Sequence, residues 1–150
     1  IYALTLHDAL AIGGDVADIA TSIALKKTPG CNTFGTTSVV TTDPNGLPIT
    51  VNFSRPTDVP VDIELDVSPR AGYSTDVEAA QIAALTLYGN ALGIGETLVF
   101  NRLWVPANLA GSPYSGTFEV VTLTANGGTA DIPVEYDENI VINSVTVTQV

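Results

Sequence analysis

The pattern that could most readily do chemistry is a row of three carboxylates, Asp62, Glu64 and Asp66, at every second position. Side chains two residues apart on a β-strand point to the same side, roughly 7 Å from each other. Carboxylates at such distances can act as acid and base in a hydrolase, or bind a metal ion. Alternating acids are also a common solvating device on the wet side of a strand, where they discourage edge-to-edge pairing. We expect this second role.

A nucleophilic hydrolase would need a base, and His7, followed by Asp8, is the only histidine. Such a base must be oriented by a third group and must reach a nucleophile. No serine in the sequence has the G-x-S-x-G context of an α/β-hydrolase nucleophile. We therefore interpret His7 as an ordinary surface histidine and predict that the chain is not an enzyme, with no catalytic residues.

Three other motifs could be taken for ligand sites, but each lacks what its chemistry requires. The segment 43–46 (Asp-Pro-Asn-Gly) lacks the spaced acids and closing glutamate of a calcium loop. The segment 93–96 contains a G-x-G, but it follows a predicted helix, whereas a phosphate-binding loop follows a strand. Cys31 is the only cysteine, which excludes an intrachain disulfide and a cysteine zinc site. We expect no cofactor and no bound metal.

The composition limits the partners. The chain has 16 acidic and five basic residues, a net charge of -11, so it repels phosphate and we expect no nucleic-acid binding. No apolar run approaches the roughly 18 residues of a membrane-spanning helix, and we expect no membrane partner. The 150 residues begin at Ile1 and contain no methionine, so we expect a piece of a longer protein.

Two helices and several strands must position these residues. Asp15 is a good N-cap for a first helix, and Thr75 with Glu78 has the spacing of a capping box for a second. The core side of the second helix is predicted to contain Val77, Ala80, Ala84, Leu87 and Ala91. The helices are expected at 15–27 and 75–88, with a short helical stretch in 101–110. The strands are expected at 1–6, 36–42, 49–53, 59–67, 97–100, 118–124, 130–134 and 140–150.

Two turn signals join neighbouring strands into hairpins. The segment 43–46 presets a turn between the strands around it, and 125–128 (Ala-Asn-Gly-Gly) is typical of a tight hairpin. The clearest strand is 59–67, in which Val59, Val61, Ile63, Leu65 and Val67 alternate with polar residues or proline. The predicted class is α+β, with a mixed, largely antiparallel sheet and two main helices packed on one face.

An ordered series of motifs runs through the chain from Gly30 onward. It comprises Pro29-Gly30-Cys31 with Gly35, the hairpin 42–46, the strand 51–53 with Arg55-Pro56, the alternating strand 59–67, Gly93-Ile94-Gly95-Glu96, Asn101-Arg102-Leu103, and the closing strand 138–148. In this order the motifs resemble the baseplate J-like family, the wedge proteins of contractile phage tails. The similarity covers about 120 residues.

The resemblance implies a domain organisation and a role. Residues 1–46 would be the end of a middle domain (strand, helix, strand), and residues 47–150 a C-terminal α+β domain. Members of the family are structural proteins that link wedge subunits around the tail hub. The implied partners are other wedge and hub proteins and copies of the chain itself. The implied location is the virion, in the tail baseplate, after assembly in the bacterial host cytoplasm.

The candidate interface residues are Arg55, Arg102 and Trp104, because arginine and aromatic side chains are the usual anchors of protein interfaces. The alternative is a glycan-binding module of a surface adhesin or tail fibre, which would require several exposed aromatic rings on one face. A metal-dependent hydrolase built on the acidic strand is a third possibility, and it would need further ligands from distant segments.

Overall fold

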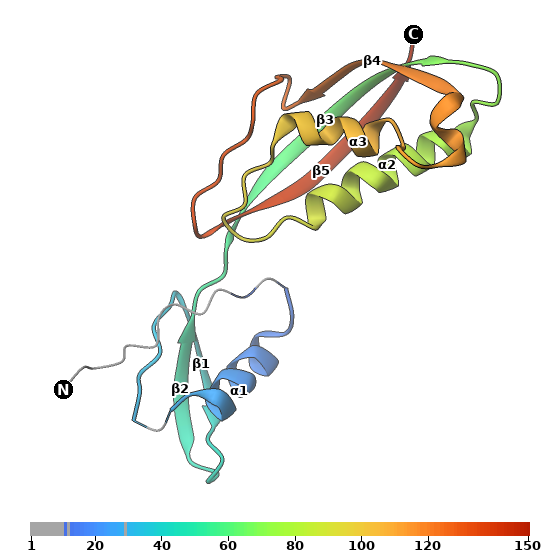
Figure 1. The fold of residues 1–150 in the computed structure, drawn as a ribbon. Coiled ribbons are helices and arrows are strands. Elements are labelled where there is room, and N and C mark those ends of the chain that lie inside the picture. The colour runs from blue at the N-terminus through green and yellow to red at the C-terminus, as the bar shows by residue number, and fades with distance from the viewer. Residues whose placement is uncertain (1–10, 12, 29) are drawn as a thin grey trace. The chain divides into compact units, whose positions relative to one another are not determined.

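The computed structural model describes residues 11, 13–28 and 30–150. The chain forms two compact units, Ile1–Pro56 and Thr57–Val150, each of which is considered by itself (Figure 1). The strand predicted at 1–6 and the pair His7-Asp8 lie outside the described residues. The domain boundary implied by the resemblance, between 46 and 47, stays a prediction.

The N-terminal unit consists of helix α1 (Val16–Lys26) packed on a hairpin of β1 (Thr37–Thr42) and β2 (Pro48–Phe53). Asp15 caps the helix as predicted, because its carboxylate accepts the N–H groups of residues 17 and 18 at 2.8 and 3.3 Å. The small core of this unit contains Ala20, Ala24, Val51 and Phe53.

The turn of the hairpin is the one predicted at 43–46. The Asp43 carboxylate accepts the N–H groups of Asn45 and Leu47 at 2.8 and 2.9 Å, and the Gly46 N–H donates to the Asp43 carbonyl at 2.9 Å. Gly46 has φ of 81°, which glycine adopts without steric cost. These bonds fix the register that places residue 42 opposite residue 48.

The C-terminal unit is a three-stranded sheet in the order β4-β3-β5. The central strand β3 (Thr57–Pro69) pairs antiparallel with β4 (Phe118–Ala125) and parallel with β5 (Glu138–Gln149). With the antiparallel β1–β2 pair, this confirms the predicted α+β class with mixed, largely antiparallel pairing. The two main helices are divided between the units: α1 packs on the hairpin, and α2 on the three-stranded sheet.

Helix α2 (Thr75–Asn90) packs against β5, and a short helix α3 (Trp104–Ala107) packs against α2 and β4 (Figure 1). Two 3₁₀ turns, η1 (Phe100–Leu103) and η2 (Pro113–Gly116), flank α3. The predicted helical stretch in 101–110 is therefore confirmed as η1 followed by α3. Together these elements cover one face of the sheet and leave the other face open.

The apolar and polar side chains of β3 point to opposite faces of the sheet, as predicted. Val61, Ile63, Leu65 and Val67 are fully buried under the helices, and Asp62 and Glu64 are exposed on the opposite side. On the helix side, the buried residues of α2 are Val77, Gln81, Leu85 and Gly89. The prediction that Leu87 and Ala91 lie in the core is wrong, since the Leu87 side chain is 72% exposed and Ala91 is exposed as well. Apolar residues occur on both sides of this helix, so the sequence did not define one buried face.

The predicted capping box is also wrong. The N-cap of α2 is Ser74, in an extended conformation, and it makes no side-chain capping bond. The N–H of Glu78 donates to the Ser74 carbonyl at 3.2 Å. The helix begins at Thr75 itself, so the Thr75 side chain stands one position too late to cap.

Two short predicted strands, 97–100 and 130–134, do not form. They contribute a single bridge, in which Leu98 and Ile132 exchange two backbone hydrogen bonds of 3.0 Å. The chain then turns into η1, because the Phe100 N–H donates to the Asp131 carboxylate at 2.8 Å instead of to a ladder. The predicted tight turn at 125–128 is present, but the chain after it leaves β4.

Candidate interaction surfaces

The open face of the C-terminal sheet has an acidic row along β3, made of Asp62, Glu64 and Asp66. The register places this row between hydroxyl-bearing residues: Thr122 and Thr124 on β4, and Ser144, Thr146 and Thr148 on β5. The Thr122 hydroxyl donates to Asp66, and the Thr124 hydroxyl donates to Glu64 at 3.4 Å. Neighbouring strands therefore supply hydroxyl donors for the carboxylates.

Asp62 is the most strongly held member of this row. The Ser144 hydroxyl donates to its Oδ1, and the Asn143 side-chain amide donates to the same oxygen at 2.7 Å. These donors, Ser144 first and Asn143 second, lower the pKa of the Asp62 carboxyl below its usual value, because they stabilise the charged form. A general acid would need a raised pKa, so this environment is unsuited to that role.

The described residues contain no group of three His, Cys, Asp or Glu side chains placed to hold a metal ion. The acidic row has the two-residue spacing foreseen from the sequence, but its members lie along one strand and do not converge. Residues 62, 64 and 66 instead form a solvated surface with satisfied carboxylates. This geometry fits a binding face for positively charged groups better than a reaction centre.

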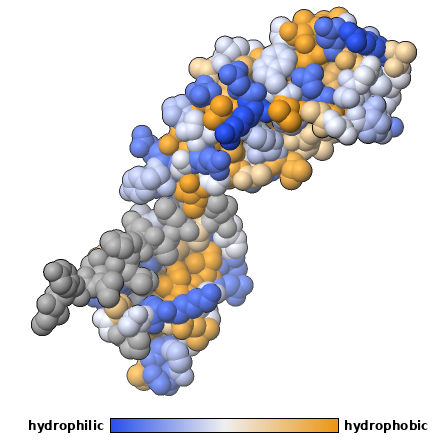
Figure 2. All heavy atoms as spheres, in the orientation of Figure 1, coloured by the Kyte–Doolittle hydropathy of each residue, from blue (hydrophilic) through white to orange (hydrophobic). Residues whose placement is uncertain are grey.

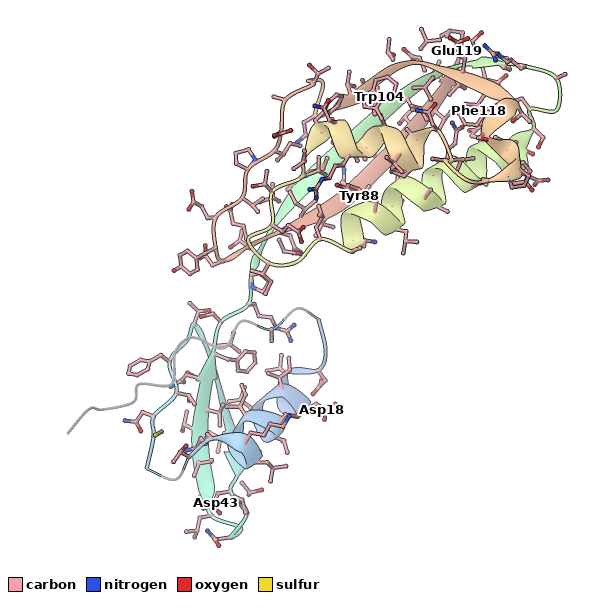
Figure 3. All side chains as sticks on the ribbon, viewed as in Figure 1. Asp18, Asp43, Tyr88, Trp104, Phe118 and Glu119 are labelled. Carbon is pink, nitrogen blue, oxygen red and sulfur yellow. The ribbon has the colours of Figure 1, made fainter. Side chains whose placement is uncertain are left out.

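The predicted interface residues Arg102 and Trp104 lie at the junction of η1 and α3 (Figure 3). Arg102 is exposed, and its guanidinium makes no hydrogen bond or ion pair with any described residue. Trp104 is half-buried against the core of the C-terminal unit. Val105, next to it, is 61% exposed. Among the described residues, an unpaired cation in η1 is therefore followed closely by a partly exposed ring at the start of α3.

The third candidate, Arg55, belongs to the N-terminal unit and is held within it. Its guanidinium donates to the carbonyls of Gly13 and Gly14, both at 2.8 Å, and lies 6.0 Å from the centre of the Phe53 ring. These contacts fasten the segment before α1 to the end of β2. The structure thus gives Arg55 a role within its own unit.

The outer side of α2 is a surface that the sequence interpretation missed. No charged residue occurs between Ala79 and Asn90. Ala79, Ala83 and Leu87, spaced by four residues and so on one side of the helix, are all exposed. A surface helix normally has charged residues on its outer face. The uncharged segment is visible in the sequence, but the prediction of Leu87 as a core residue hides its meaning.

The N-terminal unit has a surface pocket of about 460 Å³ where the end of α1 meets the turn of the hairpin. Its walls include Lys27 and Asp43, together with the apolar side chains of Leu25 and Ile49. Asp43 (Figure 3) is engaged in its own turn, whose backbone N–H groups, that of Leu47 first, lower the pKa of its carboxyl. Lys27 donates to the Cys31 carbonyl at 3.0 Å. Both charged groups thus already have structural partners.

Apolar side chains are also exposed on this unit, and Figure 2 shows apolar residues gathered on its visible side with hydrophilic residues beside them. The large hydrophobic residues exposed by more than half are Leu25, Phe34, Val40 and Leu47. Exposed apolar groups that gather on a surface often mark a protein contact.

Compared with known proteins, the chain matches no protein-family model and no curated protein. Among the described residues, no helix combines the length and hydrophobicity that crossing a bilayer requires.

Proposed function

We propose that the chain is a structural component of the baseplate wedge of a contractile phage tail, or of a phage-derived particle. In this role it assembles around the tail hub by contacts with other wedge and hub proteins and with copies of itself. The order of sequence motifs supports the baseplate identity, and the surfaces of the two units support assembly by protein contacts.

The observation that carries the assembly role is the uncharged outer side of α2. The Leu87 side chain is 72% exposed, and the helix has no charged residue in its last 12 positions. Such exposed apolar surface is unfavourable for an isolated domain. Contact with another protein would remove this apolar area from water, at roughly 25 cal/mol for each Å² buried. Specific interfaces of moderate size bury about 1,200–2,000 Å² in total, so neighbouring surfaces would have to contribute as well.

The glycan-binding alternative fits the C-terminal unit less well. Its exposed tyrosines are Tyr114, which precedes β4, and Tyr136, which precedes β5. The start of β4 pairs with the end of β3, and the start of β5 pairs with the beginning of β3. The two rings therefore belong to opposite ends of a 13-residue strand, roughly 40 Å apart along its length. They cannot stack on one sugar.

Affinity capture tests the proposal directly. The tagged protein is expressed in cells that produce the contractile particle, and its partners are identified by mass spectrometry. We expect tail-tube, hub or wedge proteins, and we expect Leu87→Glu to reduce their recovery. Val121→Glu, which places the same charge on another exposed apolar position of the same unit, is the matched control. Retention on host glycans, with no tail protein recovered, would contradict the proposal.

A further inference from the structure

Strand β5 has an open edge. It pairs with β3 over 11 residue positions and with no other strand in the described part of the chain. Helix α2 contacts β5 on the side of the sheet where Ile142 packs against Gly89. The backbone groups on that edge are consequently available to a further strand.

The register defines which groups these are. At the two ends of the pairing, the Thr57 N–H donates to the Asp137 carbonyl and the Val150 N–H donates to the Val67 carbonyl, both at 2.9 Å. In a parallel ladder, the backbone N–H and C=O groups of every second residue point toward the partner strand. The bulge opposite Val61/Asp62 shifts this alternation by one residue. The residues whose N–H and C=O groups face away from β3 are therefore Glu138, Ile140, Ile142, Val145, Val147 and Gln149. Of these groups, the Glu138 carbonyl accepts the Gly95 N–H at 2.8 Å.

This edge has little of the usual protection against pairing, the bulge near Asn143 being its one such device. Natural edge strands are short, or contain lysine, proline or inward-pointing charges. The segment 139–150 contains no charged residue, no proline and no glycine, and it is rich in valine, isoleucine and threonine. The bulge near Asn143 is its single irregularity. A long, uncharged, β-branched edge of this kind favours addition of a strand from another protein.

The charge of the C-terminal unit indicates what kind of strand would fit. Residues 57–150 contain 12 Asp and Glu but two basic residues, Arg70 and Arg102. The acidic row 62, 64, 66 lies directly across β5 from the open edge, opposite Ser144, Thr146 and Thr148. These small side chains would let a long basic side chain lie over β5. A strand added at the edge would be two strand spacings, roughly 10 Å, from β3.

We propose that β5 is the docking edge for an extended segment of a partner protein that has Lys or Arg at alternate positions. The segment joins the sheet as a fourth strand, and its basic side chains reach the acidic row on the open face. The inference deepens the proposed assembly role and rests on it in one respect, that the partner is a protein. A second copy of this chain fits less well, because it would bring two acidic units together.

Peptide binding tests the docking edge without knowledge of the natural partner. The probe is a ten-residue peptide of alternating Lys and Val, measured by calorimetry against the whole chain. Two control peptides are used. The first alternates Glu and Val and so reverses the charge. The second replaces two central valines by proline, which keeps the charge but cannot form the hydrogen bonds of a ladder. We expect binding of the Lys-Val peptide alone, weakening as salt rises.

Charge variants test the acidic row. Glu64→Gln with Asp66→Asn should weaken binding roughly three- to tenfold, because each cross-strand charge pair contributes a modest amount. Asp76→Asn with Glu78→Gln makes the same change of net charge on α2 and should leave the affinity nearly unchanged. Equal losses from both pairs of substitutions would show general charge attraction and would overturn the proposal.

Amide hydrogen exchange, resolved by residue, tests the edge itself. Bound peptide should protect the N–H groups of alternate residues, 140, 142, 145, 147 and 149, which face away from β3. Binding by the proline peptide, protection at another surface, or no binding of the Lys-Val peptide would each overturn the proposal. Such a failure would leave the baseplate role standing, because that role is tested separately by the identity of captured proteins.

Discussion

At the scale of single residues, Gln81 shows how the C-terminal unit tolerates a polar group in its core. Its side chain is fully buried, its amide donates to the Ala107 carbonyl at 3.1 Å, and its Oε1 lies 3.4 Å from the Tyr73 hydroxyl. No buried side-chain nitrogen or oxygen among the described residues lacks a partner. Gln81 therefore joins α2 to α3, the element that presents Trp104.

Gln81→Leu should destabilise the C-terminal unit by about 1–3 kcal/mol, because it leaves the buried Ala107 carbonyl without a donor. Tyr73→Phe is the comparison, and it should cost less because the bond it removes is long. Unfolding followed by fluorescence measures both, since Trp104 is the only tryptophan and lies in this unit. An equal or smaller cost for Gln81→Leu would contradict this role.

Gly35 is the position in the N-terminal unit where no other residue fits. It has φ of 151°, and a Cβ added there would lie 2.0 Å from the carbonyl carbon of Phe53. Gly35→Ala should therefore cost about 3 kcal/mol or more. Gly46→Ala, at positive φ but in open space, should cost only about 1 kcal/mol. Hydrogen exchange of the β1–β2 amides distinguishes the two. Similar exchange in both variants would show that the close approach to Phe53 is unimportant.

The environment of Asp62 predicts that the stability of the C-terminal unit depends on pH. Its pKa is lowered in the folded state, so its contribution to stability is present above the ordinary value of 3.8 and is lost as pH falls through the depressed folded pKa. The fluorescence-detected stability of the C-terminal unit should therefore fall in this acid range, and Asp62→Asn should flatten that part of the curve. Asp43→Asn, in the other unit, should leave it unaltered. An unchanged curve for Asp62→Asn would refute the assignment.

At the scale of elements, the contact between α2 and β5 depends on a glycine inside a helix. A Cβ on Gly89 would lie 2.2 Å from Cγ1 of Ile142. The helix can approach the strand this closely only because residue 89 has no side chain. The contact fixes α2 on the sheet, and Leu87, on the other side of the helix, stays exposed.

Gly89→Ala should destabilise the C-terminal unit by roughly 1–3 kcal/mol, although alanine is the better helix former by about 1 kcal/mol. In an Ile142→Ala background the same change should become neutral or stabilising, because the obstructing atoms are gone. A double-mutant cycle on the unfolding free energies measures this coupling. Additive effects would contradict the close contact.

Some features of the helices and strands were predictable from the sequence, and others were not. The β3 alternation, the α1 cap and the 43–46 turn depend on local spacing, and all three were predictable. The parallel pairing of β3 and β5 joins segments some 80 residues apart in the chain, and no local pattern specifies it. The open edge of β5 follows only from that sheet order. Trp104 and Arg102 could be named from residue type, but their exposure could not.

At the scale of the whole molecule, the two units have separate cores and differ in charge. Each exposes large apolar residues, and most of the acidic charge belongs to the C-terminal unit. Assembly with other proteins would cover both the apolar outer side of α2 and the open edge of β5. A hydrolase account would require converging acids, and those of β3 are spread along one strand.

Electron microscopy of labelled particles tests the proposed location in the tail baseplate. An antibody raised against the chain, with a gold label, is applied to contractile-tailed particles purified from the producing cells. We predict labels at the baseplate end of the tail, and none on particles from cells in which the gene is deleted. Labels confined to the distal parts of fibres, or absent from particles although the protein is abundant in the lysate, would contradict the account.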